Sequence, residues 1–185
     1  MQSSSSVPIT GSKKLSFIIA IVFALAVCGV WTSTASAVNN DVVVFDIDGT
    51  LTNDAVSVTP HPGAVNAVKA YVAKKYAVVY VTGRPEALRL STQAWLALYG
   101  FPSRPLYMAP IPYLTDASLI QYKTDVLKKL EVGTPEVRHA YGDSSTDFVA
   151  YHNVGVPQAK VWALKKVSTP TCESGIWNAC LPNYT

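Results

Sequence analysis

The segment VVVFDIDGTLTND, residues 42–54, constrains the fold of this chain more than any other. Its four apolar residues, three of them β-branched, are typical of a buried strand, and they run directly into Asp46 and Asp48. The following Gly49 predicts a turn that lets the two carboxylates converge on one point. Like charges at close range are costly unless a cation compensates them. Mg²⁺ is the expected cation, because it prefers oxygen ligands and keeps water or substrate phosphate in its shell.

Two later segments also place polar residues at the ends of apolar strands. AVVYVTGRP ends in Thr82 and Gly83 before a helix, so a hydroxyl and free backbone N–H groups face an anion. VRHAYGDSSTDF delivers Asp143 into a turn, and Asp147 follows four residues later. Acidic residues that face Asp46 are tolerated together only around a cation. The sequence therefore predicts one metal and anion site built from distant segments.

Strands of this kind alternate with amphipathic helices, of which residues 116–130, containing Lys123, form the clearest. The alternation predicts an α/β fold, a three-layer Rossmann-like parallel sheet with helices on both faces. Ligands of such sheets bind at the carboxyl ends of the strands. The intervals from Asp46 to Thr82 and from Thr82 to Lys123 are short, so we expect no sizeable cap domain. The last strand is predicted at Lys160–Leu164.

DIDGTLT resembles the DxDxT nucleophile motif of the haloacid dehalogenase (HAD) superfamily of phosphatases, and the other segments resemble its remaining motifs in order. This resemblance implies a phosphomonoester hydrolase in which Asp46 attacks phosphorus and forms an aspartyl-phosphate. Asp48 would protonate the leaving oxygen and then activate water. Thr82, Gly83 and Lys123 would bind the phosphate of the substrate.

The same resemblance implies a set of metal ligands and supporting residues. Mg²⁺ would be held by Asp46, the Asp48 carbonyl and Asp143. Asp147 would hold metal-bound waters or orient the motif lysine, and Thr50 is a further supporting residue. Thr50 together with Asp48 argues against dehalogenase chemistry, which has no use for a second acid at that position.

Within the superfamily, VVYVTGRPEALRLSTQAWLALYGFPSRPLYM followed by YKTDVLKKL is similar to the LNS2 (lipin/Ned1/Smp2) domain. That domain occurs in lipin-type phosphatidate phosphatases and in phosphatidylinositol-transfer proteins. The similarity covers roughly residues 42–164 and implies a phosphatidate-like phospholipid substrate and peripheral membrane contact. A non-catalytic phospholipid-binding module is the alternative, as in transfer-protein versions whose nucleophile motif is degraded. The presence of Asp46, Asp48, Lys123 and Asp143 favours the enzyme.

Residues 1–37 predict a secretory signal peptide. A lysine pair precedes the apolar run 15–31, and an A-x-A cleavage site ends at Ala37. Cleavage before Val38 would release a HAD-like phosphatase domain of residues 38–185 to the periplasm or the cell exterior. The apolar run is long for a signal and short for a membrane span, so a retained membrane anchor is the alternative.

Cysteine usage and charge complete the sequence-based expectations. Cys172 and Cys180 are close in sequence, and export would favour a disulfide between them, with two free thiols as the alternative. The formal net charge of +3 is mild, and no clustered basic face indicates nucleic-acid binding. The sequence leaves the oligomeric state open.

Overall fold

The computed structural model describes residues 41–110, 115–130 and 136–185. The signal peptide predicted for residues 1–37 lies outside the described residues. No helix within the described ranges is long and apolar enough to cross a membrane.

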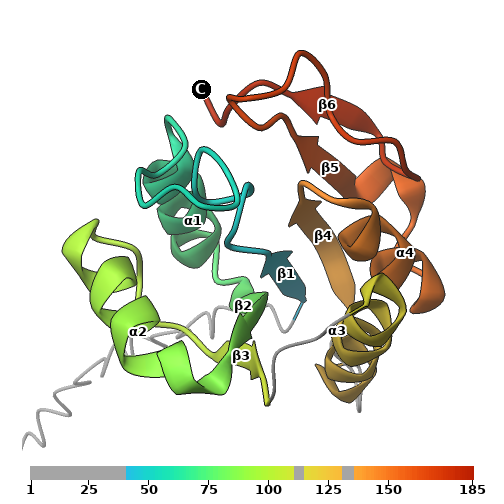
Figure 1. Ribbon diagram of the computed structural model, residues 1–185, viewed down its shortest axis with the longest axis horizontal. Coiled ribbons are helices and arrows are strands. Elements are labelled where there is room, and N and C mark those ends of the chain that lie inside the picture. The colour runs from blue at the N-terminus through green and yellow to red at the C-terminus, as the bar shows by residue number, and fades with distance from the viewer. Residues whose placement is uncertain (1–40, 111–114, 131–135) are drawn as a thin grey trace, which may run out of the picture. The chain divides into compact units, whose positions relative to one another are not determined.

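Six parallel strands of the described chain form one sheet in the order β3-β2-β1-β4-β5-β6 (Figure 1). The strands are β1 (Val42–Phe45), β2 (Ala77–Pro85), β3 (Leu106–Ala109), β4 (Val137–Gly142), β5 (Val161–Leu164) and β6 (Ala179–Leu181). The chain extends from β1 first to β2 and β3 and then crosses back to β4 on the other side. In such sheets the ligand crevice lies where the strand order reverses, here at the carboxyl ends of β1 and β4.

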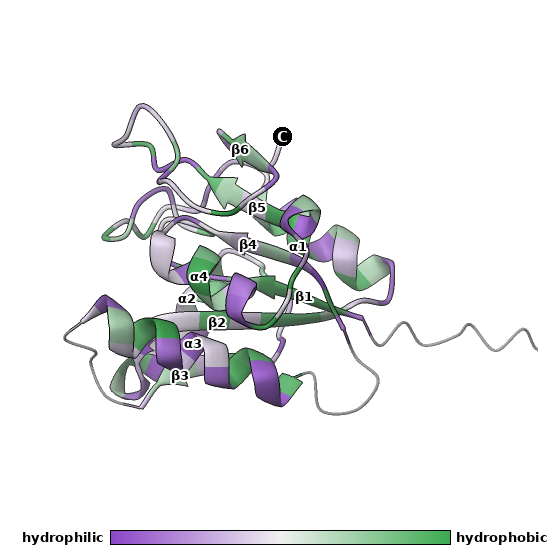
Figure 2. Cartoon of the chain, turned by 90° about the vertical axis from the view of Figure 1, so that its right-hand side faces the viewer, coloured by the Kyte–Doolittle hydropathy of each residue, from purple (hydrophilic) through white to green (hydrophobic). Residues whose placement is uncertain are grey.

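Helices cover both faces of the sheet, as Figure 2 shows with hydrophobic residues in green. They are α1 (Ala64–Ala73), α2 (Arg89–Leu98), α3 (Asp116–Leu130) and α4 (Ser145–Asn153). Val43 and Phe45 of β1 face a core shared with α1 and α2. Val42 and Val44 face the opposite core, shared with α3 and α4. This alternation explains why all four residues of β1 are buried, and it confirms the predicted three-layer α/β fold.

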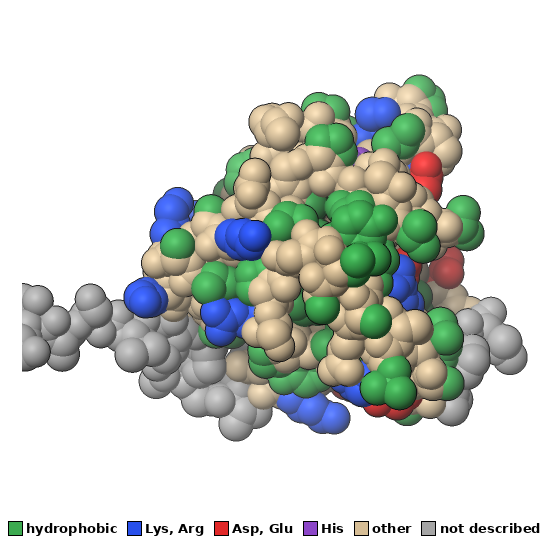
Figure 3. Space-filling model, turned by 90° about the vertical axis from the view of Figure 1, so that its left-hand side faces the viewer, with side chains coloured by type: hydrophobic (Ala, Val, Ile, Leu, Met, Phe, Trp, Pro, Cys, Tyr) green, Lys and Arg blue, Asp and Glu red, His purple; other side chains and the backbone are tan. Residues whose placement is uncertain are grey.

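The connection between β2 and α2 differs from the prediction. Pro85 has an extended backbone, and a 3₁₀ turn (Glu86–Leu88) comes before α2, so the helix does not begin at the proline. Leu88 lies in this turn and is exposed, as is Tyr99 at the end of α2. Figure 3 views the side on which α2 lies and shows hydrophobic side chains gathered at the surface among lysine and arginine side chains.

The C-terminal tail adds a strand that the sequence did not predict. Lys160 belongs to a 3₁₀ turn (Gln158–Lys160), β5 begins one residue later, and β6 extends the sheet beyond it. The prediction that Lys160–Leu164 is the last strand was therefore wrong. Cys180 of β6 forms a disulfide with Cys172, which ties the tail into a short loop beside β5.

Candidate active site

The carboxyl end of β1 leads into a tight turn that carries Asp46. The backbone N–H of Asp46 donates to a β4 carbonyl (3.1 Å), and the N–H groups of residues 50–52 all donate to the Ile47 carbonyl. Gly49 in this turn has a φ of 75°, in the left-handed region that favours glycine. A Cβ at Gly49 would lie 2.2 Å from Asp143 Oδ2. Glycine at this position therefore lets the carboxylate from β4 approach the turn.

Lys123 is buried and joins two carboxylates from different elements. Its Nζ lies 2.9 Å from Asp46 Oδ1 and 2.5 Å from Asp147 Oδ1. Asp147 is itself held in the capping box that begins α4, where the Ser144 hydroxyl donates to Asp147 Oδ2 (2.8 Å). Burial pushes the pKa of Lys123 down, but Asp147 and Asp46 push it further up, so the net pKa is raised. Lys123 is therefore a fixed positive charge beside Asp46.

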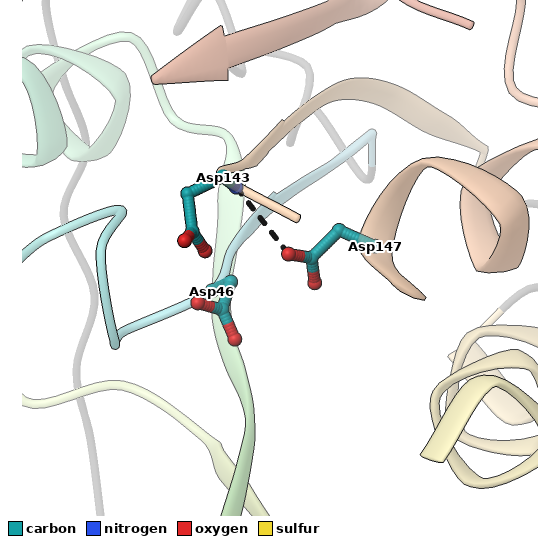
Figure 4. A group of neighbouring side chains, drawn as sticks. All are labelled: Asp46, Asp143 and Asp147. Carbon is teal, nitrogen blue, oxygen red and sulfur yellow. Dashed lines mark hydrogen bonds between the residues drawn. The ribbon is translucent and has the colours of Figure 1, made fainter. Parts of the chain in front are cut away.

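Asp46, Asp143 and Asp147 form a buried group, hereafter the acidic cluster. One oxygen of each carboxylate lies within 4.8 Å of the other two. Figure 4 shows the three side chains around a common space at the ends of β1 and β4 and the start of α4. Burial raises the pKa of Asp46 well above its ordinary value, against the opposing charge of Lys123. Burial, with the nearby Asp147, raises the pKa of Asp143 to about 6.

The acidic cluster suits a divalent cation. Its donors are carboxylate oxygens, which hard cations such as Mg²⁺ and Ca²⁺ prefer. Burial and mutual repulsion raise the pKa values of Asp46 and Asp143, and a bound cation would offset both effects. The three carboxylates thus fit the metal that the sequence led us to expect.

Asp143 has two further partners outside the cluster. Thr50 Oγ1 donates to Asp143 Oδ1 (3.3 Å), so Thr50 lies beside the acidic cluster. Lys166 Nζ lies 2.9 Å from Asp143 Oδ2 and 3.5 Å from a Glu173 oxygen. Sequence reasoning missed Lys166. Its signal was the lysine pair that directly follows the β5 segment, at the same edge of the sheet.

Asp48 lies apart from the cluster and pairs with Arg84. The Arg84 Nε lies 2.9 Å from Asp48 Oδ2, and Nη2 lies 2.6 Å from Oδ1. Thr82 Oγ1 donates to the same carboxylate (3.4 Å). This fork geometry holds both oxygens of Asp48. Sequence reasoning did not predict that Arg84, on β2, would pair with Asp48.

The remaining predicted residues lie at the edges of the site. Gly83 follows Thr82 on β2, and a Cβ there would lie 3.1 Å from Leu119 of α3, so Gly83 permits close packing of the strand and helix. His61 lies in the loop before α1. Its ring is buried near Tyr184, and burial lowers its pKa.

Comparison with known proteins assigns this arrangement to a family. A family model described as "PITM 1-3, LNS2 domain" matches residues 43–165, which include every residue of the acidic cluster. The chain belongs to the LNS2 domain family. This confirms the similarity stated from the sequence, within the HAD-like fold.

Relatives of this LNS2 chain are large proteins. It is 32% identical over 131 residues to Protein retinal degeneration B of Drosophila melanogaster, covering 68% of the chain and 10% of that protein. It is 37% identical over 73 residues to Membrane-associated phosphatidylinositol transfer protein 1 of Homo sapiens, covering 37% of the chain and 6% of that protein. The LNS2 chain thus spans about a tenth or less of the length of these relatives.

A solved structure shares the fold of the LNS2 chain. The structure titled "Structure of the Pnkp1/Rnl/Hen1 RNA repair complex" aligns with a TM-score of 0.56 at 19% identity. The alignment covers 76% of this chain and 44% of that chain. At this level of identity the comparison shows a common fold alone.

Proposed function

We propose that the LNS2 domain hydrolyses phosphomonoesters through an aspartyl-phosphate on Asp46, with Mg²⁺ as cofactor. The observation that carries the proposal is the buried contact of Lys123 with Asp46 and Asp147 beside Asp143. A carboxylate that attacks phosphorus must be ionised and must lie beside positive charge, because the substrate is an anion. Lys123 supplies the positive charge, and a bound cation would offset the burial that raises the pKa of Asp46.

The proposed reaction has two steps. In the first, an Asp46 oxygen bonds to phosphorus, the bond from phosphorus to the ester oxygen breaks, and Asp48 gives its proton to the departing alcohol. In the second, Asp48 takes a proton from water, whose oxygen bonds to phosphorus, and the bond to Asp46 breaks. The products are the alcohol and inorganic phosphate. Lys123 and the Thr82 hydroxyl contact the equatorial phosphoryl oxygens during both steps.

The metal-binding residues follow from the acidic cluster. Asp46 and Asp143 would hold the ion with the Asp48 carbonyl, and Asp147 would hold its waters while orienting Lys123. When bound, Mg²⁺ supplies charge stabilisation of the phosphoryl oxygens. Asp48 is held by Arg84 in this structure, so the substrate must displace the guanidinium before Asp48 contacts the leaving oxygen.

A phosphatidate-like phospholipid is the proposed substrate, taken up by peripheral contact with a membrane. Support comes from relatives named as membrane-associated phosphatidylinositol transfer proteins. A second candidate function is phospholipid binding without catalysis. The arrangement that favours it is the Arg84 fork, which occupies both oxygens of the expected general acid.

Export is a separate proposal. A signal peptide of residues 1–37 would be cleaved before Val38, leaving the domain of residues 38–185 in the periplasm or outside the cell. Intact-mass measurement on the material recovered outside the cytoplasm tests this proposal. A species that begins at Met1 would contradict cleavage and favour the membrane-anchored form.

The proposed activity is tested by phosphate release from p-nitrophenyl phosphate and from phosphatidate in mixed micelles, with and without Mg²⁺. We expect release that requires Mg²⁺ and is lost in Asp46→Asn. Asp125→Asn, at an exposed position on α3, is the matched control and should retain activity. No release from a folded protein that binds phosphatidate vesicles would reject catalysis in favour of the binding module.

A further inference from the structure

A cavity of about 390 Å³ is lined in part by Asp48, and no residue of the acidic cluster lines it. Its lining comes from the loop after β1, the end of β2 and the start of α2. The residues that carry the argument are Asp48, Arg84, Trp95, Val56, Val58 and Leu88. The volume is within the range of small-molecule sites, roughly 300–1,000 Å³. The cavity is therefore large enough for a ligand group beyond the phosphate.

Hydrogen bonds and a short antiparallel bridge connect the segments that line this cavity. Trp95 of α2 donates its indole N–H to the Val58 carbonyl (2.6 Å), which links the helix to the loop after β1. The base of that loop is closed by an antiparallel bridge between Thr52 and Pro60. Arg84 also contacts Thr92 Oγ1 (3.3 Å), and its Cζ lies 5.8 Å from the centre of the Trp95 ring. The cavity is consequently formed before any ligand arrives.

Three exposed apolar side chains lie at the rim of the cavity, and the hydroxyl groups of Ser57, Ser91 and Thr92 also line it. Val56 is 97% exposed, Val58 66% and Leu88 46%. Three large apolar side chains around one opening are a costly arrangement in water, and such patches mark binding surfaces. Apart from Asp48, which Arg84 neutralises, no acidic residue lines the cavity. An uncharged ligand group suits this lining better than a second anion, and the three exposed apolar side chains favour an apolar one.

The position of Asp48 says which part of a substrate reaches the cavity. In the proposed reaction Asp48 protonates the oxygen of the departing alcohol, so the carbon attached to that oxygen lies next to Asp48. We propose that this cavity is the subsite for the departing alcohol and that it selects phosphomonoesters of apolar alcohols. The inference rests on the proposed function, because it takes the phosphoryl group to lie between Asp46 and Lys123.

Alkylphosphonates test the subsite without any reaction, because their carbon chain replaces the ester oxygen and the alcohol. Titration calorimetry in the presence of Mg²⁺ compares ethylphosphonate with butylphosphonate. Each buried methylene is worth roughly fourfold in affinity, so butylphosphonate, with two more methylenes, should bind about sixteenfold more tightly. The double variant Val58→Asn/Leu88→Asn should reduce this ratio to about twofold or less. Leu98→Asn, exposed on α2 but outside the cavity, should keep the wild-type ratio.

The outcomes separate the subsite from the catalytic proposal. Equal affinity for both phosphonates, no measurable binding of butylphosphonate, or an unchanged ratio in the double variant overturns the subsite. Phosphate release from ethyl and butyl phosphate is measured in parallel. Release with no dependence on chain length keeps the phosphatase and rejects the subsite. A third outcome is an affinity ratio of butylphosphonate to ethylphosphonate that depends on Val58 and Leu88, with no phosphate release from either ester. This outcome rejects catalysis and supports a binding site for amphiphilic phosphates.

Discussion

At the scale of single residues, the site depends on how buried charges are paired. Lys123 has two carboxylate partners, and removing a partner from a buried ion pair leaves a charge without compensation. Asp143 takes its own cation, Lys166, from the loop after β5. Each acid of the cluster therefore contacts a lysine. Asp46 and Asp147 share Lys123, and Asp143 contacts Lys166.

Lys123→Met should test this dependence directly. The variant leaves the buried acidic cluster without its central positive charge, so we expect the free energy of unfolding to fall by about 3–5 kcal/mol in metal-free buffer. Phosphatase activity should be lost as well. Urea denaturation measures the stability. Lys129→Met on the exposed side of the same helix should change it little, and equal stability of the two variants would contradict the role of Lys123.

His61 should make folding stability depend on pH. Burial lowers its pKa in the folded protein, with Asp54 opposing the shift and Lys165 adding to it. As the pH falls through about 6.5, the unfolded chain takes up the His61 proton first, so the His61 contribution to stability falls with falling pH, by at most about 1.4 kcal/mol per pH unit. Asp143, whose pKa is raised to about 6, contributes with the opposite sign over the same range.

The corresponding experiment compares unfolding between pH 7.5 and pH 5.5. The stability of His61→Gln relative to the wild type should rise as the pH falls, because the variant lacks the unfavourable His61 contribution. Some slope should remain, because the half-buried His139 also has a lowered pKa. His152→Gln, at an exposed position on α4, is the matched control. A wild-type slope in His61→Gln would show that the buried ring does not contribute.

At the scale of elements, the turn after β1 brings two strands into one site. Gly49 has a positive φ and Asp143 lies against its Cα, so the turn and the end of β4 fit only without a side chain there. Gly155 also has a positive φ, of 80°, yet a Cβ there would meet nothing within 4 Å. A side chain at Gly155 would therefore meet only backbone strain, whereas a side chain at Gly49 would meet both backbone strain and a clash with Asp143.

Alanine at each position should give different results. Gly155→Ala should cost about 1–2 kcal/mol of stability, because only the left-handed backbone is strained. Gly49→Ala should cost more and should also lower Mg²⁺-dependent phosphate release, because its Cβ must displace the Asp143 carboxylate. Thermal unfolding and phosphate release together measure both effects. Equal losses of stability and of phosphate release in the two variants would mean that Asp143 can move away from the new Cβ without effect on either quantity.

At the scale of the whole described domain, the C-terminal tail returns to the site. The Tyr184 hydroxyl donates to the Thr50 carbonyl in the turn after β1 (3.3 Å), and its ring lies 5.6 Å from that of Tyr141 on β4. Glu173, next to Cys172, accepts the N–H of Ser145 (2.8 Å) at the start of α4. The tail therefore connects elements that already hold the acidic cluster.

The disulfide should stabilise this tail. Cys172 and Cys180 are separated by 8 positions, and closing a loop of that size is worth about 2–3 kcal/mol in the chain-entropy model. Cys172→Ser/Cys180→Ser should lose that amount in urea denaturation. Reductant should lower the stability of the wild type to a similar level without affecting the double variant. An unchanged double variant would show that β6 holds the tail unaided.

The sequence by itself determined the order of strands and helices as far as β5 and the residues at the carboxyl ends of β1, β2 and β4. Apolar periodicity and strand-ending motifs are local, so the segments that carry Asp46, Thr82 and Asp143 could be read directly. Lys123 was found in the same way, from a lysine between the apolar turns of a helix and its resemblance to a motif. The LNS2 similarity followed from those segments.

Only the tertiary structure decided which side chains pair. The Arg84 fork on Asp48, the contact of Lys166 with Asp143 and the burial of His61 each join segments that are distant in sequence. The strand β6 likewise forms because the tail lies beside β5, although its three residues carry too short a pattern to predict a strand. Local patterns select elements, whereas partners are selected by the approach of elements in three dimensions.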